Sequence, residues 1–430
     1  ARGHHLFHAD GTPRFLISTR LSCHMTAPDV WMDAIRYLKA HHIERVLFIM
    51  GGIAGTTPRL FGPDLDFDRY DVETFRAIDT FIDALRREGM IASPYFYYFN
   101  DRLQRQMTPE QDRAYIRYGM ARFGAYANVL PVLSNEVEQK FTERRSPYDL
   151  GAHDWANAMG AVLKEAATFG LPVTVHNPQE TEQAINPGFY TLLRDWPFPW
   201  ADCMLRQAQV GSLGAADEIR DDIPEQKNAT YNARAYARHN ELMADLRRYG
   251  IPVVNEEPGY EMNAMSWDRA VVITRPWCTQ SPRTILTTFW TAATAGAYAM
   301  WGNASTYELG DPLPGISDSV TPARLRLLHD VMISLPYWEM APANGSVSAA
   351  EVEVGGVGYR TNYCLARPGA AYLVFSLHGG PVTVDLAPGA TYRPTLVDPR
   401  TGAQSALPPV PGGAQEFVLP EREQVLVLRA

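Results

Sequence analysis

The chain has 430 residues, of which 46% are hydrophobic, and this is enough for a large core and two or three domains of average size. The net charge is −9 with scattered basic residues, so neither a nucleic acid nor an anionic membrane is expected as a partner. No apolar run reaches the roughly 20 residues that a membrane-spanning helix needs, so no membrane insertion is expected.

Short apolar runs alternate with amphipathic helical stretches up to about residue 336. Strands are predicted at residues 14–19, 43–50, 90–98, 128–134, 171–176, 200–207, 251–256 and 296–302. Helices are predicted at residues 27–42, 72–89, 108–124, 154–170, 231–250, 281–295 and 321–335. Pro28 near a first turn, Thr108 as a cap before a proline and Gly89 at a helix end mark boundaries.

This alternation predicts an α/β fold of the (β/α)₈ TIM barrel type. A doubly wound open sheet is the alternative, and it would need a glycine-rich phosphate turn after the first strand. The sequence there is STRLSCHM (18–25), which contains no glycine. The barrel is therefore favoured.

The pattern changes after about residue 340, where apolar and polar residues alternate between Gly and Pro turns. This pattern predicts an antiparallel β-sandwich and no helix. The predicted organisation is a catalytic barrel over residues 1–338 and a β-sandwich domain over residues 339–430. Because no Gly/Ser linker joins them, we expect the sandwich to pack firmly on the barrel as structural support.

The cysteines and histidine pairs give no sign of a metal site. The cysteines lie apart in sequence and are interpreted as isolated buried thiols, although one disulfide between two of them remains an alternative. They are Cys23, Cys203, Cys278 and Cys364. The histidine pairs at residues 4–5 and 41–42 have no ligand partner at a useful spacing and are interpreted as surface residues. The chain begins at Ala1 without methionine, so a leader could have been removed, which favours a secreted or periplasmic location.

Two predicted strands end in acids, and chemistry in such barrels lies at the C-terminal strand ends. The acids and their neighbours are Asn135, Glu136 and Glu138 after the fourth strand, and Glu256, Glu257 and Glu261 after the seventh. These two strand ends lie roughly across the barrel mouth. Retaining glycosidases need two carboxyl groups roughly 5–5.5 Å apart, one as acid/base and one as nucleophile. Surface glutamates on loops are the alternative.

An Asn-Glu after the fourth strand with a Glu after the seventh resembles clan A of the glycoside hydrolases. More narrowly, the chain resembles the apiosidase-like family, glycoside hydrolase family 140 and its relatives. The matching segments are FHADGTPRFLIST (7–19), YANVLPVLSNE (126–136), VTVHNP (173–178), ADCMLRQ (201–207), IPVVNEEPGYE (251–261), AGAYAMWGN (295–303) and VDPRTG (397–402). The resemblance covers nearly the whole chain and is strongest at EEPGYE (256–261).

The resemblance implies a retaining glycoside hydrolase that acts on a carbohydrate and needs no metal or organic cofactor. The family pattern places the nucleophile directly before the proline, at Glu257, and leaves Glu136 as the acid/base. Asn135 would hold the 2-hydroxyl of the sugar. Tyr260 and Glu261 follow the family pattern and are expected to line the pocket.

Two departures from the family pattern bear on this reading. Glu256 takes the place of a residue that is usually small, and strand alternation would turn it to the side opposite Glu257. Family members often carry an aspartate in a Gly-Gly-Asp run after the fourth strand, where this chain has Ser134, Asn135 and Glu136. This difference brings the chain closer to the general clan A pattern and leaves the identity of the substrate sugar undetermined. A furanoside or a polysaccharide side chain is a candidate substrate.

Other strand tips supply candidate sugar contacts. His176 closes the fifth predicted strand and Gln207 the sixth, so both are expected at the same mouth, where they could bind hydroxyl groups. Trp301 at the end of the eighth strand is predicted to stack on a sugar ring, with core filling as the alternative. Weaker candidates for the mouth are His24, Tyr97 and Asn100.

Two other functions remain as alternatives. A lyase or isomerase on the same barrel would require a lysine base or clustered metal-binding acids at the strand ends, and the sequence places neither there. A catalytically inactive carbohydrate-binding protein would keep the aromatic residues and lose one of the two glutamates, whereas both are present.

Overall fold

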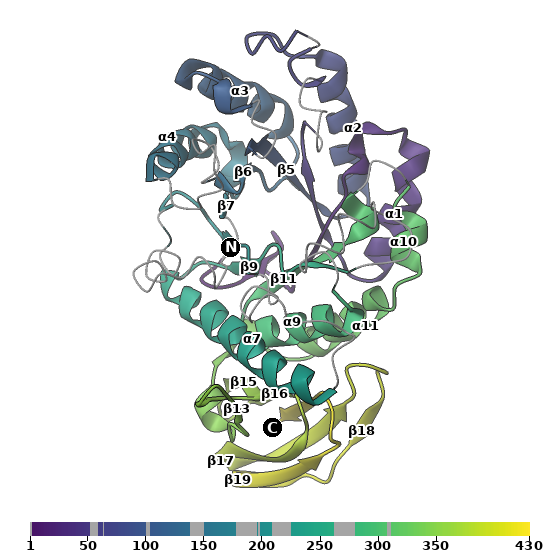
Figure 1. The fold of residues 1–430 in the computed structure, drawn as a ribbon, viewed down its shortest axis with the longest axis vertical. Coiled ribbons are helices and arrows are strands. Elements are labelled where there is room, and N and C mark those ends of the chain that lie inside the picture. The colour runs from purple at the N-terminus through teal and green to yellow at the C-terminus, as the bar shows by residue number, and fades with distance from the viewer. Residues whose placement is uncertain are drawn as a thin grey trace.

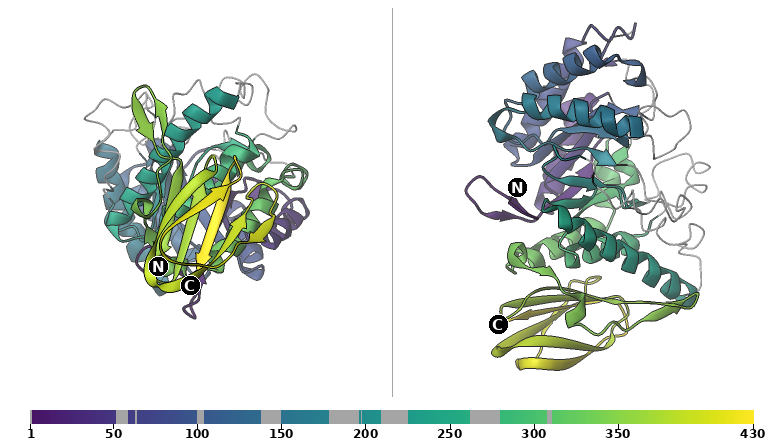
Figure 2. Two further views of the ribbon diagram at one scale, coloured as in Figure 1. Left: turned by 90° about the horizontal axis from the view of Figure 1, so that it is seen from below. Right: turned by 90° about the vertical axis from the view of Figure 1, so that its left-hand side faces the viewer.

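A computed structural model of the chain describes residues 2–51, 59–62, 64–99, 104–137, 150–177, 196, 198–208, 225–261, 280–307 and 311–430. Figure 1 shows a barrel of strands surrounded by helices, with an antiparallel β part below it. The N-terminal hairpin of β1 (Leu6–Phe7) and β2 (Pro13–Arg14) projects from the barrel in Figure 2.

Parallel strands form the barrel wall. In chain order they are β3 (Ile17–Arg20), β4 (Arg45–Ile49), β5 (Ile91–Tyr98), β6 (Val132–Asn135), β7 (His176–Asn177), β8 (Met204–Arg206), β9 (Val253–Asn255) and β11 (Tyr298–Asn303). Their spatial order is β6-β5-β4-β3-β11-β9-β8-β7. A parallel bridge between Val132 and Thr174 joins the two ends of this order. The short strand β10 (Tyr260–Glu261) pairs with β11 at the rim.

Helices surround the barrel, and the third of them begins at Thr108, the cap that the sequence indicates. They are α1 (Pro28–Ala40), α2 (Val72–Arg87), α3 (Pro109–Phe123), α4 (Leu150–Ala166), α7 (Glu225–Leu246), α9 (Pro282–Thr294), α10 (Leu313–Ser317) and α11 (Thr321–Ile333). Thr108 and Gln111 form a reciprocal capping box at the start of α3. Ser281 caps α9 by accepting a hydrogen bond from the Thr284 amide. The barrel predicted from the sequence is confirmed.

The C-terminal part is antiparallel. Its strands are β12 (Ala341–Pro342), β13 (Val352–Val354), β14 (Val357–Tyr359), β15 (Asn362–Arg367), β16 (Ala371–Ser376), β17 (Gly380–Val397), β18 (Gln404–Ala406), β19 (Val410–Leu419) and β20 (Gln424–Arg429). The long strand β17 pairs with β19 through its first half and with β20 through its second half. It therefore passes from one layer to the other, as the predicted sandwich requires.

Alternation along β15 and β16 decides which face meets the barrel. Tyr363 and Phe375 belong to the same buried cluster as the barrel, whereas Cys364 and Val374 belong to a separate cluster inside the β part. The ring of Trp290 on α9 stacks on Phe375 with centroids 6.2 Å apart. α9 is thus covered on both sides, because the barrel lies on one side and the sheet on the other (Figure 1).

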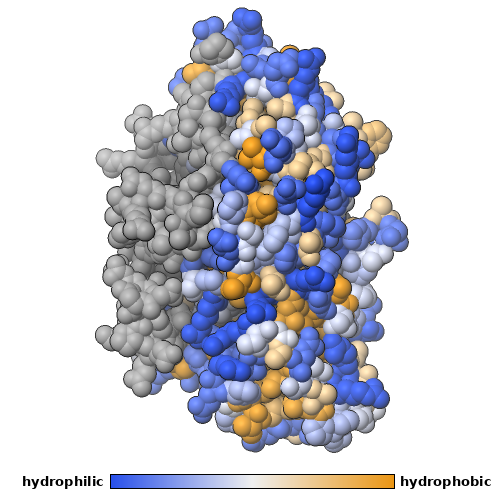
Figure 3. Space-filling model, turned by 90° about the vertical axis from the view of Figure 1, so that its right-hand side faces the viewer, coloured by the Kyte–Doolittle hydropathy of each residue, from blue (hydrophilic) through white to orange (hydrophobic). Residues whose placement is uncertain are grey.

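Hydrophobic and hydrophilic residues are mixed on the face of the molecule that Figure 3 shows. Figure 3 shows hydrophobic residues in small groups among hydrophilic ones, on the part of that face that the structure describes. Among the helices of the described ranges, none combines the length and the apolar character that crossing a membrane would require. Cys23, Cys203 and Cys364 are free and buried, and Cys278 lies outside the described residues.

Candidate active site

Glu136 and Glu257 follow two different strands of the barrel. β6 ends at Asn135, directly before Glu136, and β9 ends at Asn255, two residues before Glu257. Glu136 is partly exposed, and its φ of 41° lies in the left-handed region, which is uncommon for a residue other than glycine. Glu257 is only 8% exposed. One carboxyl group is therefore open to solvent, while the other is largely removed from it.

Glu256 points into the barrel interior, where its charge is neutralised. Its two oxygens accept hydrogen bonds from Arg45 Nη1 at 2.6 Å and from Arg45 Nη2 at 2.7 Å. The Tyr95 hydroxyl donates to the same carboxylate at 2.5 Å. Because β9 ends at Asn255, strand alternation does not extend to Glu256 and Glu257. Their hydrogen-bond partners, and not alternation, distinguish the two acids.

The electrostatic environment of Glu257 differs from that of an ordinary carboxyl group. Burial, and then the negative charge of Glu136, raise the pKa of Glu257 to about 8. The positive charge of Arg20 and a hydrogen bond from Tyr260 act in the opposite direction. The carboxyl groups of Glu136 and Glu257 are therefore close enough to repel each other.

Asn135 connects Glu136 to His176. Its Nδ2 donates to Glu136 Oε2 at 3.1 Å, and its Oδ1 lies 3.1 Å from His176 Nδ1. Burial, followed by the charge of Arg20, lowers the pKa of His176 to about 3, so the ring is neutral. With Oδ1 as the acceptor, the Nδ1 atom carries the proton and Nε2 is left as an acceptor.

Some buried polar atoms near the strand ends have no hydrogen-bond partner among the described residues. Among them are His176 Nε2 and Gln207 Oε1, in side chains that are 1% and 3% exposed. Buried polar atoms normally find partners, so each of these atoms can accept a hydrogen bond from a bound molecule. Gln207 directly follows β8 and His176 begins β7, so they come from adjacent strands.

Tyr260, Glu261 and Trp301 form the rim on the other side of β9. The hydroxyl of Tyr260 donates to Glu257. Trp301 is fully buried, and its Nε1 donates to Glu261 Oε2 at 2.9 Å. Ser319 donates to the other oxygen of Glu261. Tyr260 thus contacts an acid of the site directly, whereas Glu261 orients a tryptophan.

Several weaker candidates lie elsewhere. His24 packs on the rings of Phe48 and Phe81, between β4 and α2. Tyr97 packs on Tyr115 and Trp155, from α3 and α4. The remaining candidates, Asn100 and Glu138, lie outside the described residues.

Sequence reasoning missed Arg20, Arg45 and Tyr95. Arg45 and Tyr95 hold Glu256, and Arg20 acts electrostatically on both Glu257 and His176. The signal available was an arginine inside or at the end of an otherwise apolar strand, since a buried arginine needs an acidic partner. The partner itself could not be identified from the sequence.

One group of His and Asp side chains within the described ranges has metal-ligand spacing, and it lies outside this site. The side chains at the strand ends are instead carboxylates, amides, one neutral imidazole and arginines. Such a set can transfer protons, bind hydroxyl groups and stabilise negative charge.

Comparisons with known proteins identify the family and the fold of the chain. The family described as "Apiosidase-like, catalytic domain" matches residues 50–312. A glycoside hydrolase family 5 structure from Bacteroides vulgatus ATCC 8482 superposes with a TM-score of 0.72 at 15% identity, covering 99% of this chain and 92% of the other. A structure titled "Glycoside hydrolase" gives a TM-score of 0.71 at 16% identity, covering 99% and 95%.

A more distant similarity is to a family 51 arabinofuranosidase from Xanthomonas axonopodis pv. citri. Its TM-score is 0.56 at 11% identity, covering 93% of this chain and 89% of the other. No curated protein sequence matches the chain. At these identities the structural similarities establish the fold, which includes both the barrel and the C-terminal β part.

Proposed function

The chain belongs to the apiosidase-like family and is a glycoside hydrolase, and on this premise we propose that it cleaves its substrate with retention of configuration. Glu257 is the nucleophile and Glu136 the acid/base. The observation that carries this assignment is that Glu256 and Glu257 have different neighbours. Glu256 is buried against Arg45 and Tyr95, whereas Glu257 interacts electrostatically with Glu136.

The raised pKa of Glu257 is compatible with a nucleophile when the two acids are considered together. Two carboxyl groups that repel each other at a buried site do not both ionise readily, so near neutral pH the pair holds one proton. Tyr260 and Arg20 stabilise the charged form of Glu257. The mechanism requires this proton to lie on Glu136 when the substrate binds, so that Glu136 can protonate the leaving oxygen while Glu257 attacks as a carboxylate.

The reaction then follows two steps. A carboxylate oxygen of Glu257 attacks the anomeric carbon while the bond to the leaving oxygen breaks, and Glu136 gives its proton to that oxygen. The products are a free alcohol and a glycosyl ester on Glu257. Glu136, now ionised, takes a proton from water as the water attacks the anomeric carbon, which releases Glu257 and restores the starting protonation.

The substrate hydroxyls have defined partners in this proposal. Asn135, which already contacts Glu136, holds the 2-hydroxyl, where hydrogen bonds that strengthen in the transition state contribute several kcal/mol. His176 Nε2 and Gln207 Oε1 accept hydrogen bonds from other hydroxyls, which would supply their missing partners. Tyr260 and Glu261 line the pocket, and Trp301 forms its floor or stacks on the sugar ring.

We further propose a substrate with a furanosyl group or a polysaccharide side chain. The family name refers to apiosidases, and one structural relative is titled an arabinofuranosidase. The Ser134-Asn135-Glu136 sequence departs from the family pattern, so apiose is one candidate among several furanoses.

A panel of aryl glycosides that includes furanosides tests the activity, and NMR of the first product from an active substrate tests retention. A fluorosugar of the same configuration should label Glu257 alone. Fragmentation of the peptide that contains residues 256 and 257 identifies the labelled acid. An inverted first product, or a label on Glu256 or Glu261, would overturn the mechanism. Activity on no member of the panel would favour the inactive carbohydrate-binding alternative.

A further inference from the structure

A cavity lies at the end of the barrel opposite to Glu136 and Glu257. Its volume is about 520 Å³, and its lining includes residues that precede the strands β3, β4 and β5 together with residues from α11 and beyond. The charged and titratable side chains of its lining include Arg14, Lys39, His42, Glu44 and His329. This cavity plays no part in the proposed hydrolysis.

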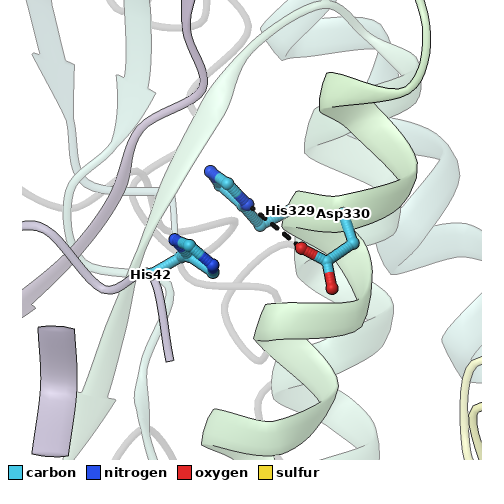
Figure 4. Close-up of side chains that lie close together, drawn as sticks. All are labelled: His42, His329 and Asp330. Atoms are coloured by element: carbon cyan, nitrogen blue, oxygen red, sulfur yellow. Dashed lines mark ion pairs between the residues drawn. The ribbon is translucent and has the colours of Figure 1, made fainter. Parts of the chain in front are cut away.

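Two histidines stack on each other at this cavity. The rings of His42 and His329 are 4.0 Å apart between centroids and within 5° of parallel (Figure 4). His42 lies in the turn between α1 and β4, and His329 lies on α11. The first and last principal helices of the barrel are thus brought together through these two side chains.

The backbone at His42 is unusual. Its φ is 58°, in the left-handed position after a helix, and its amide donates to Lys39 O. Glycine is the ordinary residue at such a position, because a Cβ is unfavourable there. A strained residue other than glycine often marks a functional constraint, and here the strained residue contributes an imidazole to a cluster of donors.

Carboxylates complete the cluster. Potential ligand atoms of His42, His329 and Asp330 all lie within 4.8 Å of one another. His329 Nδ1 is 3.5 Å from Asp330 Oδ1, which is too long for a good hydrogen bond, and Figure 4 shows the carboxylate beside the two rings. Glu44 Oε1 is 3.7 Å from His42 Nδ1.

We propose that His42, His329 and Asp330 bind a divalent metal ion of the zinc class, with water or Glu44 in a fourth position. Two imidazoles and a carboxylate are a typical ligand set for Zn²⁺. Bonds of about 2.0–2.1 Å to a tetrahedral ion place ligand atoms roughly 3.3–3.5 Å apart. The ligand atoms lie within 4.8 Å of one another, so they must draw closer when the ion binds. The two rings must also turn out of their parallel stack, because each imidazole nitrogen donates in the plane of its own ring.

Neighbouring cations limit the affinity of this site. Lys39 and Arg14 bind Glu44 at 2.6 Å and 3.0 Å, so Glu44 is the weakest of the ligands. The exposed Arg326 lies 3.9 Å from Asp330. These positive charges oppose a second positive ion, so we expect dissociation constants on the order of micromolar, well above those of structural zinc sites.

The ion would connect the turn before β4 to α11, which joins the beginning of the barrel to its end. Binding to the folded state alone raises the stability of that state. Because the cluster lies at the end of the barrel opposite Glu136 and Glu257, occupancy should change thermal stability and leave the pH profile of hydrolysis unchanged. The site is therefore a structural one.

The test uses the full chain after treatment with a chelator. Titration with ZnCl₂ in a calorimeter should give one site, and Tm should rise by a few degrees when Zn²⁺ is in about hundredfold excess over Kd. Co²⁺ in place of Zn²⁺ should give the visible absorption of a four-coordinate ion.

Two independent variants and a matched control decide the outcome. His329→Phe keeps a ring for stacking, and His42→Asn keeps a residue that tolerates positive φ. Each should weaken Zn²⁺ binding at least tenfold. His41→Asn removes the adjacent imidazole, whose Nδ1 pairs with Tyr37 O, and should leave Kd unchanged. Unchanged binding in both cluster variants, or a loss in the control, would overturn the proposal.

Discussion

Arg45 and Glu256 form a bidentate ion pair across the interior of the barrel, with Nη1–Oε2 and Nη2–Oε1 distances of 2.6 Å and 2.7 Å. The two residues are 0% and 2% exposed. Glu256 directly precedes Glu257 in the chain, yet the two consecutive glutamates have different environments. Glu256 is held by a fixed positive charge, and Glu257 is exposed to the field of a second acid.

Glu256→Gln should destabilise the fold. The substitution leaves Arg45 charged and buried without a carboxylate, and breaking one member of such a pair costs about 3–5 kcal/mol. Urea unfolding at pH 7 measures this loss. Replacing both members, as in Arg45→Met with Glu256→Leu, should recover much of it. Glu73→Gln removes an exposed partner of Arg76 and serves as the control, with an expected change below about 0.5 kcal/mol. A loss below about 1 kcal/mol for Glu256→Gln would contradict the prediction.

Glu257→Gln should abolish turnover while the fold stays intact. The amide is nearly isosteric with the carboxylate but cannot form a glycosyl ester. We expect a loss in kcat on the order of 10⁴-fold or more. Activity assays on the best aryl substrate, with circular dichroism as the fold control, measure this. Glu256→Gln should lose much less activity per folded molecule, so comparable losses in the two variants would mean that the assignment is wrong.

Glu257→Gln should also change the free energy of unfolding, by an amount that depends on pH. The pKa of Glu257, about 8 in the folded protein, lies above the ordinary 4.5, so the folded state binds this proton more tightly than the unfolded state. This contribution to stability is complete below pH 4.5 and is lost as pH rises through 8. Glu257→Gln should therefore be more stable than the parent at pH 8, by about 1–3 kcal/mol, and not at pH 4.5. Urea unfolding at the two pH values checks this, and a difference independent of pH would refute it.

Tyr260→Phe should shift the pH profile of hydrolysis. The Tyr260 hydroxyl donates to Glu257 and lowers its pKa, so its removal should raise that pKa further and leave less of the nucleophile ionised at neutral pH. A hydrogen bond to a charged group contributes about 1.5–3 kcal/mol, so kcat/KM should fall roughly 10- to 100-fold, with the acid limb moved to higher pH. Tyr363→Phe removes a buried hydroxyl in the C-terminal part and is the control. A fall in rate with no movement of the acid limb would point to a packing role.

The boundary proposed near residue 338 separates two parts that depend on each other. α11 ends at Ile333 and β12 begins at Ala341, so a cut there interrupts no α-helix or long strand and divides only the 3₁₀ turn at Tyr337–Glu339. Truncation after residue 338 would still expose the face of α9 that carries Trp290, and the shortened chain should aggregate. Limited proteolysis of the full chain should not release the sandwich readily. A soluble, stable barrel from the truncated chain would show that the two parts fold independently.

Local patterns in the sequence were sufficient for the barrel. Apolar runs, caps such as Thr108 and helix-ending glycines such as Gly89 act over a few residues, so the predicted strands and helices fall close to the observed ones. The change to two-residue alternation after residue 340 likewise indicated the β-sandwich. Glu136 and Glu257 were predicted as the reacting pair because a parallel barrel brings the C-terminal ends of its strands to one mouth, and the family resemblance chose Glu257 over Glu256.

The pairing of side chains across the molecule was decided only by the tertiary structure. Arg45 and Glu256 are separated by 211 positions, and no sequence pattern around either residue identifies the other as its partner. His5, interpreted as a surface residue, is instead buried against the hydroxyl of Tyr298, and His42 stacks on His329 although the sequence offered it no partner. Secondary structure depends on interactions between neighbours in sequence, which a pattern records. Charge pairing inside a closed barrel depends on which side chains the closure turns inward, and that is fixed only when the whole sheet has formed.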